Sequence, residues 1–312
     1  MMREMQASLQ KLPWNELSPT AQAKARSVVS GTPLFHRMPR QTVYADPEIY
    51  HFLLRHPDVI IGFWEHLGDT QLALYEVKEN HYILKETAGT AATVEVLYRT
   101  DEICIVYAKG EYRGPLLAKS YQGDVLLVLR TRFVRDEMNE PMVVCDLDTF
   151  IQISSLGADV LAKLFFTSLS KVADSNFEVT TSFVGQVSKA AYRNPEALKN
   201  AAGEIGSIRQ SVCAEFCEIV DRATIRFARR HQSASTLVQQ RPQPVEQARV
   251  NYQDFSIFSK PPADWDMNHF VATPLPSYEG LRSDSTGVLN TPKFLDSYPS
   301  RHVVPKLPKQ TQ

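Results

Sequence analysis

The fold is decided by residues 71–153, a run of consecutive β-strands whose clearest hairpin reads ATVEVLYRTDEICIVYAK (92–109). Apolar and polar side chains alternate on both sides of Thr100-Asp101, which is the pattern of a hairpin with one buried face. A two-residue loop there pairs Val94, Val96 and Tyr98 with Tyr107, Ile105 and Ile103. No helical periodicity interrupts the run, so we expect a curved antiparallel sheet.

A second hairpin precedes this one. It joins strands at 72–77 and 81–87 through Lys78-Glu79-Asn80, a turn by composition. A two-residue loop at Glu79-Asn80 places four side chains on one face: Tyr75, Val77, Tyr82 and Leu84. Tyr75, Tyr82, Tyr98 and Tyr107 are then expected on the same apolar face of the sheet.

The last hairpin joins strands at 124–135 and 142–153 through a polar turn at 136–141. One register puts Arg130 opposite Asp148 and Arg132 opposite Asp146. Four apolar side chains then lie on the reverse: Leu127, Leu129, Cys145 and Leu147. We expect the charges to face outward as a solvated ladder, with the lining of a polar cavity as the alternative, because burying them unpaired would cost roughly several kcal/mol each.

Helix signals surround the sheet. Two short helices are expected in residues 1–33, the second starting at Ser18-Pro19. Asp46 is an N-cap for a short helix that His56-Pro57 ends, and a further helix stops at Gly68.

After the sheet the apolar period becomes helical. One stripe consists of Leu161, Leu164, Phe165, Leu169 and Val172. We expect this helix to pause at 174–176 and to resume through 177–192. A separate amphipathic helix is expected at 205–230, with arginines in its last turns.

The chain is therefore divided into four regions: an N-terminal helical segment (1–33), an α+β domain (34–204), the amphipathic helix (205–230) and a disordered tail (231–312). Ten of the 19 prolines fall in the tail, which excludes long helices and central strands there. Aromatic residues are spaced between these prolines, which suggests docking on a partner protein or on the chain's own surface.

Composition narrows the function classes. A net charge of −1 and a pI near 6.7 give no electrostatic footprint for nucleic acid. No apolar run approaches 18 residues, so no transmembrane segment is expected. The four cysteines lack CxxC spacing, and we interpret them as reduced thiols of a cytoplasmic protein.

The order of a short strand, two small helices, a multi-stranded antiparallel sheet and a long helix resembles the START-like (helix-grip, polyketide cyclase-like) superfamily over about residues 40–195. The stretch Thr42-Val43-Tyr44-Ala45-Asp46-Pro47-Glu48 is similar to that superfamily's entry from strand to helix. The resemblance implies a sheet curved around its last helix, enclosing a cavity for a lipid, polyketide or other apolar ligand.

No catalytic, cofactor or metal motif is present in the sequence. His51 and His56 are five residues apart with a proline after the second, which separates them on a helix, and Cys213 and Cys217 lack a second pair of ligands. We therefore expect no cofactor. An enzyme of the same superfamily is a third possibility, in which Asp146 or His51 projects into the cavity.

The sequence thus predicts a non-enzymatic binding or transfer protein for an apolar small molecule held between the sheet and a helix at 156–173. The candidate ligand-binding residues are Tyr75, Tyr82, Val96, Tyr98, Ile105, Tyr107, Leu127, Leu129, Leu147, Leu161 and Phe165. The alternative is an interaction or assembly protein with a solid core, acting through the aromatic tail and helix 205–230.

Overall fold

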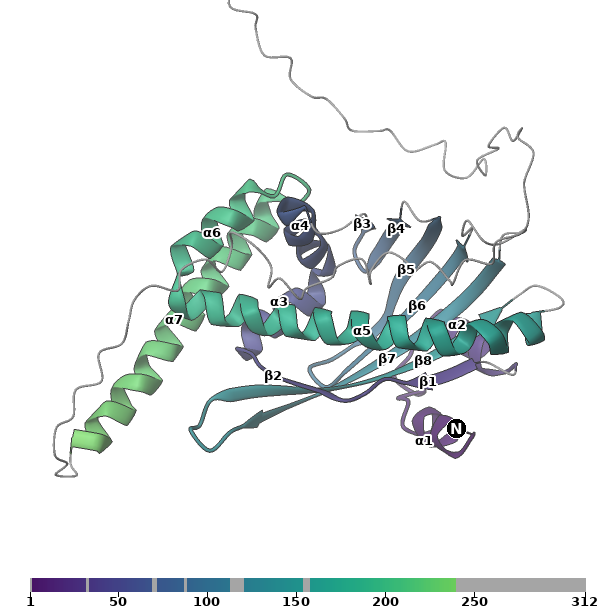
Figure 1. The fold of residues 1–312 in the computed structure, drawn as a ribbon, viewed down its shortest axis with the longest axis horizontal. Helices are drawn as coiled ribbons and strands as arrows, with labels where there is room; N and C mark the ends of the chain where they lie inside the picture. The colour runs from purple at the N-terminus through teal and green to yellow at the C-terminus, as the bar shows by residue number, and fades with distance from the viewer. Residues whose placement is uncertain are drawn as a thin grey trace, which may run out of the picture. The chain divides into compact units, whose positions relative to one another are not determined.

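The computed structural model describes residues 2–31, 34–68, 72–86, 89–112, 121–153 and 158–239. The side chains of residues 112, 121, 158–169 and 232–239 lie outside that description. Within these residues the chain forms eight strands and seven helices, and all strand pairs are antiparallel, so the α+β class is confirmed (Figure 1). None of the described helices is both long and apolar enough to cross a bilayer.

One sheet holds all the described strands in the order β1-β8-β7-β6-β5-β4-β3, with β2 also paired to β8. The strands are β1 Leu34–Arg37, β2 Gln41–Tyr44, β3 Leu72–Lys78, β4 His81–Glu86, β5 Thr90–Arg99, β6 Ile103–Tyr112, β7 Tyr121–Arg135 and β8 Pro141–Ile153. β1 and β2 follow one another along the same edge of β8, and the Met38 N–H donates to the Leu147 carbonyl between them. β1 was not predicted from the sequence.

The outer face of the sheet, as we name it here, carries the two N-terminal helices α1 (Met2–Gln10) and α2 (Pro19–Val29). Their buried side chains pack on central strand residues such as Ile105, Leu126 and Phe150. The Ser18 hydroxyl accepts a hydrogen bond from the Ala21 N–H and caps α2, as predicted.

The other five helices share one hydrophobic core with the inner face of the sheet. α3 (Pro47–Arg55) starts at the predicted cap, where the Asp46 carboxylate accepts from the N–H groups of Glu48 and Ile49. α4 (Pro57–Leu67) ends at Gly68, whose φ of 75° suits a residue without a side chain.

Three further helices complete the inner layer: α5 (Ala158–Arg193), α6 (Pro195–Glu204) and α7 (Gln210–Gln239). The predicted pause at 174–176 is wrong, since α5 is continuous and lies across the inner face of the sheet (Figure 1). Instead of competing for backbone hydrogen bonds, Asp174 bonds to His36 of β1. α6 was not predicted, although Asn194-Pro195 forms a cap and first turn.

The predicted amphipathic helix at 205–230 corresponds to α7, which begins at Gln210 and extends to Gln239. Its apolar face packs within the protein, because Val212, Phe216, Ile219 and Val220 are buried against α3, α5 and α6. The rest of the predicted tail, residues 240–312, lies outside the described residues.

Two β-bulges invert the faces predicted for the first two hairpins. The turn at Glu79-Asn80 forms as expected, but a shift between Glu76 and Lys78 places Glu76 opposite Tyr82. A second shift between Val96 and Tyr98 places Tyr98 opposite Ile105 and Val96 opposite Val106. Each bulge inserts one residue, and one residue is enough to move every later side chain to the other face.

The last hairpin keeps the predicted faces but differs in register by two residues. Arg130 lies opposite Asp146, and Arg132 lies opposite Val144. The predicted pairing of Arg132 with Asp146 is therefore wrong, and Asp146 instead pairs with Arg40 on the loop before β2.

The expectation that the charges form a solvated ladder is also wrong for Asp148. α1 covers this residue, whose side chain is 2% exposed. Its carboxylate accepts from Arg37 Nε at 2.7 Å, Arg130 Nη1 at 2.8 Å and Ser8 Oγ at 2.5 Å. The cluster therefore fastens α1 to the outer face.

Candidate functional site

The candidate site is a set of apolar side chains that share the inner face across β5 to β8. Direct cross-strand pairing aligns Val96, Val106, Leu127 and Thr149 in one row. The next row holds Val94, Ala108, Val125 and Ile151. We call the seven apolar members of these two rows the inner apolar patch: Val94, Val96, Val106, Ala108, Val125, Leu127 and Ile151.

The patch is less buried than the opposite side of the same strands. Ile105, Leu126 and Phe150, on the outer face, have no exposed surface. Their chain neighbours on the inner face, Val106 and Leu127, remain partly exposed, like the rest of the patch. The residues that α1 and α2 cover at the centre of the outer face are thus fully buried, whereas the patch on the inner face keeps some exposed surface.

The remainder of the inner face is filled. Val143 and Cys145 of β8 are buried in a core formed with α3 to α7, and Leu129 and Leu147 pack against it. On the patch side several side chains are small: Ala108 is followed on the same face by Gly110, whose cross-strand partner is Ala92. The partly exposed region of the inner face is therefore the patch, and the region near α3 is a buried core.

The structure divides the predicted ligand-binding residues between the two faces. Five lie on the inner face: Tyr82, Val96, Leu127, Leu129 and Leu147. Four lie on the outer face: Tyr75, Tyr98, Ile105 and Tyr107. The side chains of Leu161 and Phe165 lie outside the described residues. The prediction of one shared face for the four tyrosines is wrong, because each bulge separates a tyrosine from its expected neighbours.

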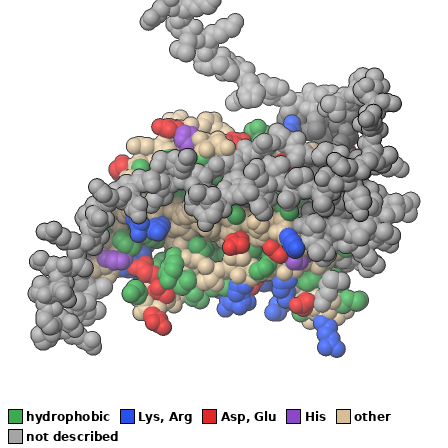
Figure 2. Space-filling view, in the orientation of Figure 1, with side chains coloured by type: hydrophobic (Ala, Val, Ile, Leu, Met, Phe, Trp, Pro, Cys, Tyr) green, Lys and Arg blue, Asp and Glu red, His purple; other side chains and the backbone are tan. Residues whose placement is uncertain are grey.

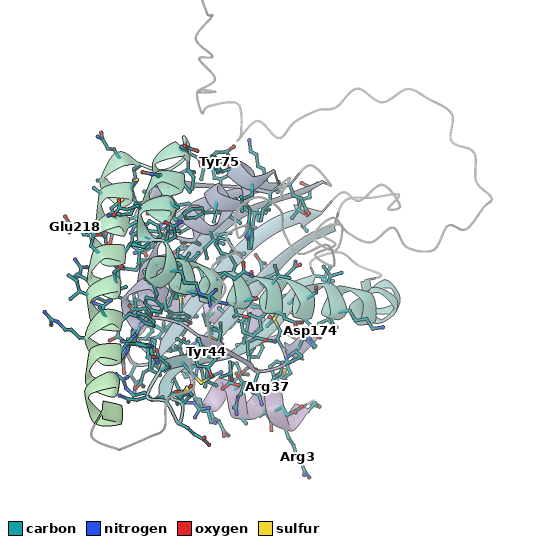
Figure 3. All side chains as sticks on the ribbon, turned by 60° about the vertical axis from the view of Figure 1, so that its left-hand side comes forward. Arg3, Arg37, Tyr44, Tyr75, Asp174 and Glu218 are labelled. Atoms are coloured by element: carbon teal, nitrogen blue, oxygen red, sulfur yellow. The ribbon has the colours of Figure 1, made fainter. Side chains whose placement is uncertain are left out.

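Three of the tyrosine hydroxyls already have protein partners. Tyr98 donates to the Glu16 carboxylate, and Tyr107 donates to Asp124 Oδ1 at 2.6 Å. Tyr82, the one tyrosine of the four on the inner face, donates to the Arg55 carbonyl at 3.1 Å, and burial raises its pKa. Tyr75 is half exposed at the sheet edge, where Figure 3 labels it.

A polar group that the sequence did not reveal lies beside the patch. His36 of β1 is the direct cross-strand partner of Thr149, and its Nε2 lies 2.7 Å from Asp174 Oδ1 on α5 (Asp174 is labelled in Figure 3). Thr149 is 6% exposed, and its hydroxyl has no hydrogen-bond partner among the described residues. These residues were missed because β1 was not predicted and because α5 was expected to break at Asp174.

Thr149, His36 and Asp174 do not form a nucleophilic relay in this structure. Activation of a hydroxyl requires a base within hydrogen-bond reach, and no bond joins Thr149 to His36 in the described structure. Asp146 and His51, the other proposed catalytic groups, do not reach the patch. Asp146 pairs with Arg40, and His51 contacts the Phe133 ring, with the ring centroids 4.9 Å apart.

Arg99 marks the other margin of the inner face. It pairs across the strands with Cys104, and its Nη2 donates to Asn80 Oδ1 at 3.1 Å. Its buried Nη1 has no partner among the described residues. Glu76, the cross-strand partner of Tyr82 on β3, pairs with Arg209.

The described residues contain no group of three or more side chains suited to hold a metal ion. His51, His56 and His66 each lie near a different carboxylate: His51 lies 3.8 Å from Asp101, His56 lies 3.8 Å from Glu215, and His66 lies 3.4 Å from Glu204. Burial lowers the pKa of His51 and of His56, and the neighbouring carboxylates only partly oppose it.

A groove of about 640 Å³ lies on the outer side, between the α1–α2 connection and the β5–β6 turn. Lys11 and Arg130 contribute basic groups to its walls, and Glu16, Asp101 and Glu102 contribute acidic ones. Acidic and basic side chains are similarly interspersed on the face shown in Figure 2. This mixture selects no ligand class, and the groove is separate from the inner apolar patch.

Comparison with known proteins does not assign the chain to a family, since no family model and no curated protein matches it. Among solved structures, a conserved protein from Geobacillus kaustophilus is 13% identical, and the alignment covers 49% of this chain and 96% of that one with a TM-score of 0.37. The hypothetical protein jhp0584 from Helicobacter pylori is 13% identical, with 51% and 93% covered and a TM-score of 0.35. At these TM-scores neither similarity carries an argument about fold or function.

Proposed function

We propose that the protein binds an apolar small molecule between the inner apolar patch and α5, in an arrangement of the helix-grip kind. The observation that supports this proposal is the contrast between the two faces of the same strands. Ile105 and Leu126 are fully buried, whereas Val106 and Leu127 beside them are not. Apolar side chains on a central sheet face are normally removed from water. A set that stays partly exposed is therefore a surface that a bound molecule can cover.

The composition of the patch sets the kind of ligand. It is built from valines, leucine, isoleucine and alanine, so burial of apolar surface supplies most of the affinity. A guest that buries about 300 Å² of apolar surface gains roughly 7.5 kcal/mol at about 25 cal/mol per Å². This gain alone corresponds to a Kd of about 3 µM, and the loss of translational and rotational freedom costs about 4 kcal/mol or more, so affinity near the millimolar range is expected for a small guest.

Ala108→Phe tests the proposal, because the new ring projects into the centre of the patch. Thr93→Phe is the matched control, since Thr93 is exposed on the outer face of the neighbouring strand. The full chain is titrated with Nile red, a neutral apolar dye, and its fluorescence is followed. Saturable binding that Ala108→Phe weakens at least about tenfold, and that Thr93→Phe leaves unchanged, supports the proposal.

A solid inner face predicts a different pair of results. Nile red then shows no saturable binding, and Ala108→Phe destabilises the fold by about 1–3 kcal/mol because the ring overpacks a filled core. Urea unfolding of both variants measures that cost. Either of these two results contradicts the proposal.

A further inference from the structure

Thr149 is the most conspicuous polar group on the inner face. Its side chain is more than nine-tenths buried, and its hydroxyl has no hydrogen-bond partner among the described residues. A buried hydroxyl without a partner lowers stability, because it has lost its bonds to water and gained none in return. Such a group is informative when it faces a surface on which a ligand is already expected.

The position of Thr149 joins it to the inner apolar patch. It stands directly opposite Leu127 of the patch on one side and opposite His36 on the other. Side chains paired in this way lie about 5 Å apart at Cβ. Thr149 therefore occupies the end of the row that continues through Leu127, Val106 and Val96.

We infer that the ligand of the inner apolar patch is a neutral molecule with a hydroxyl group, an alcohol or a phenol, whose O–H exchanges a hydrogen bond with the Thr149 hydroxyl. This inference rests on the proposed function. A hydroxyl is both donor and acceptor, like that of Thr149, so the pair forms a bond in either direction. The apolar part of the ligand then lies along Leu127 and Val106.

The surroundings of Thr149 favour a neutral head group over a carboxylate. The Asp174 carboxylate lies beside this end of the patch, where it is held by His36. A ligand carboxylate here would face a like charge in a site of reduced solvent access, which is unfavourable. Arg99 is the alternative anchor for a carboxylate, but it lies on β5, three strands away from Thr149 on β8, and its guanidinium already bonds to Asn80.

The test compares two matched series of competitors that displace Nile red from the full-length protein: naphthalene, 2-naphthol and 2-naphthoate, and octane, octan-1-ol and octanoate. Each series is measured on the wild type, on Thr149→Val, which has the same shape without the hydroxyl, and on Thr149→Ser, which keeps the hydroxyl. In at least one series we expect the alcohol to bind about tenfold more tightly than the hydrocarbon, a difference of about 1.4 kcal/mol. Thr149→Val removes that preference and Thr149→Ser retains it.

Several results overturn the inference while leaving the proposed function in place. They are equal binding of alcohol and hydrocarbon, a preference for the carboxylate, displacement by no member of either series, or an alcohol preference that survives Thr149→Val. Equal binding of alcohol and hydrocarbon, together with unchanged or lower stability of Thr149→Val, indicates that an ordered water is the partner of Thr149. If Nile red itself shows no saturable binding, the proposed function fails and this inference fails with it.

Discussion

The two aspartates of β8 provide a direct measurement of what burial does to an ion pair. Asp148 and Asp146 are two residues apart, and each accepts a bidentate pair of hydrogen bonds from an arginine at 2.7 and 3.0 Å. They differ in exposure: the Asp148 side chain is 2% exposed and that of Asp146 is 29% exposed. Asp148 also accepts hydrogen bonds from Arg130 and Ser8.

Replacement of each aspartate by alanine is expected to have unequal effects. Asp148→Ala leaves Arg37, which is 42% exposed, and Arg130, which is 22% exposed, without their shared counter-ion, so the cost is at most that of a fully buried pair, about 3–5 kcal/mol. Asp146→Ala breaks a pair whose arginine, Arg40, is 58% exposed, so the cost is about 1 kcal/mol or less. The expected difference between the two variants is therefore at most about 2–4 kcal/mol, with Asp148→Ala the less stable.

Urea unfolding at pH 7, followed by far-UV circular dichroism, measures both free energies of unfolding. The addition of salt is a second control, because it screens the exposed pair of Asp146 more than the buried pair of Asp148. Equal losses of stability in the two variants would refute the reasoning, since geometry alone would then set the strength of these pairs.

The pH dependence has a definite sign. Burial by itself raises the pKa of Asp148, but hydrogen bonds from Arg37 and Ser8 outweigh it, and the pKa lies below its ordinary value. A lowered pKa in the folded state gives stability that is complete above the unfolded pKa of about 3.9 and is lost as the pH falls through the folded value. The difference between wild type and Asp148→Ala is therefore expected to stay constant from pH 7 to about pH 5 and to shrink below about pH 4.

Three other predictions concern packing, a buried hydrogen bond and thiol reactivity. Gly185→Ala on α5 places a methyl group 2.2 Å from a β2 valine and is expected to lower the free energy of unfolding by about 1–3 kcal/mol. Gly203→Ala on α6 has open space around the new methyl group and is expected to be neutral or stabilising by up to about 1 kcal/mol. Thermal unfolding that ranks the two variants in the reverse order would contradict this account of α5. Tyr50→Phe leaves a buried threonine hydroxyl of β7 without its 2.7 Å bond and is expected to cost about 1–3 kcal/mol, so an unchanged Tm would show that water replaces the tyrosine. Burial raises the pKa of Cys104 and Cys145 to about 11, which leaves about 0.1% thiolate at pH 8; Ellman's reagent is therefore expected to modify these two only in urea, and their rapid modification in the native protein would contradict the burial.

The features that follow from short stretches of sequence were predictable. Caps at Ser18 and Asp46 and the stop at Gly68 depend on one side chain and its nearest backbone groups, and all three are confirmed. The alternation of Leu127, Leu129 and their neighbours assigned the correct faces to β7 and β8, because no bulge interrupts that pair.

The features that depend on distant contacts were not predictable. Nothing in the sequence marks the extra residue at Val77 or at Leu97, and each one reverses a face. Asp174, where a break in α5 was predicted, instead forms a hydrogen bond with His36 of a strand 138 residues away. The candidate site combines both kinds of residue: Leu127 and Val96 were predicted for it, while Thr149 and His36 were not.

The irregularity in β3 also has a protective consequence. β3 is the last strand of the sheet, and it exposes half of Tyr75 and 44% of Val77 beside backbone groups that pair with no further described strand. A straight margin of this kind is a template on which a second molecule can add a strand and begin to aggregate. The extra residue at Val77 breaks the even spacing that such a template needs, so we expect the same bulge that reverses the face of β3 to disfavour the addition of a further strand.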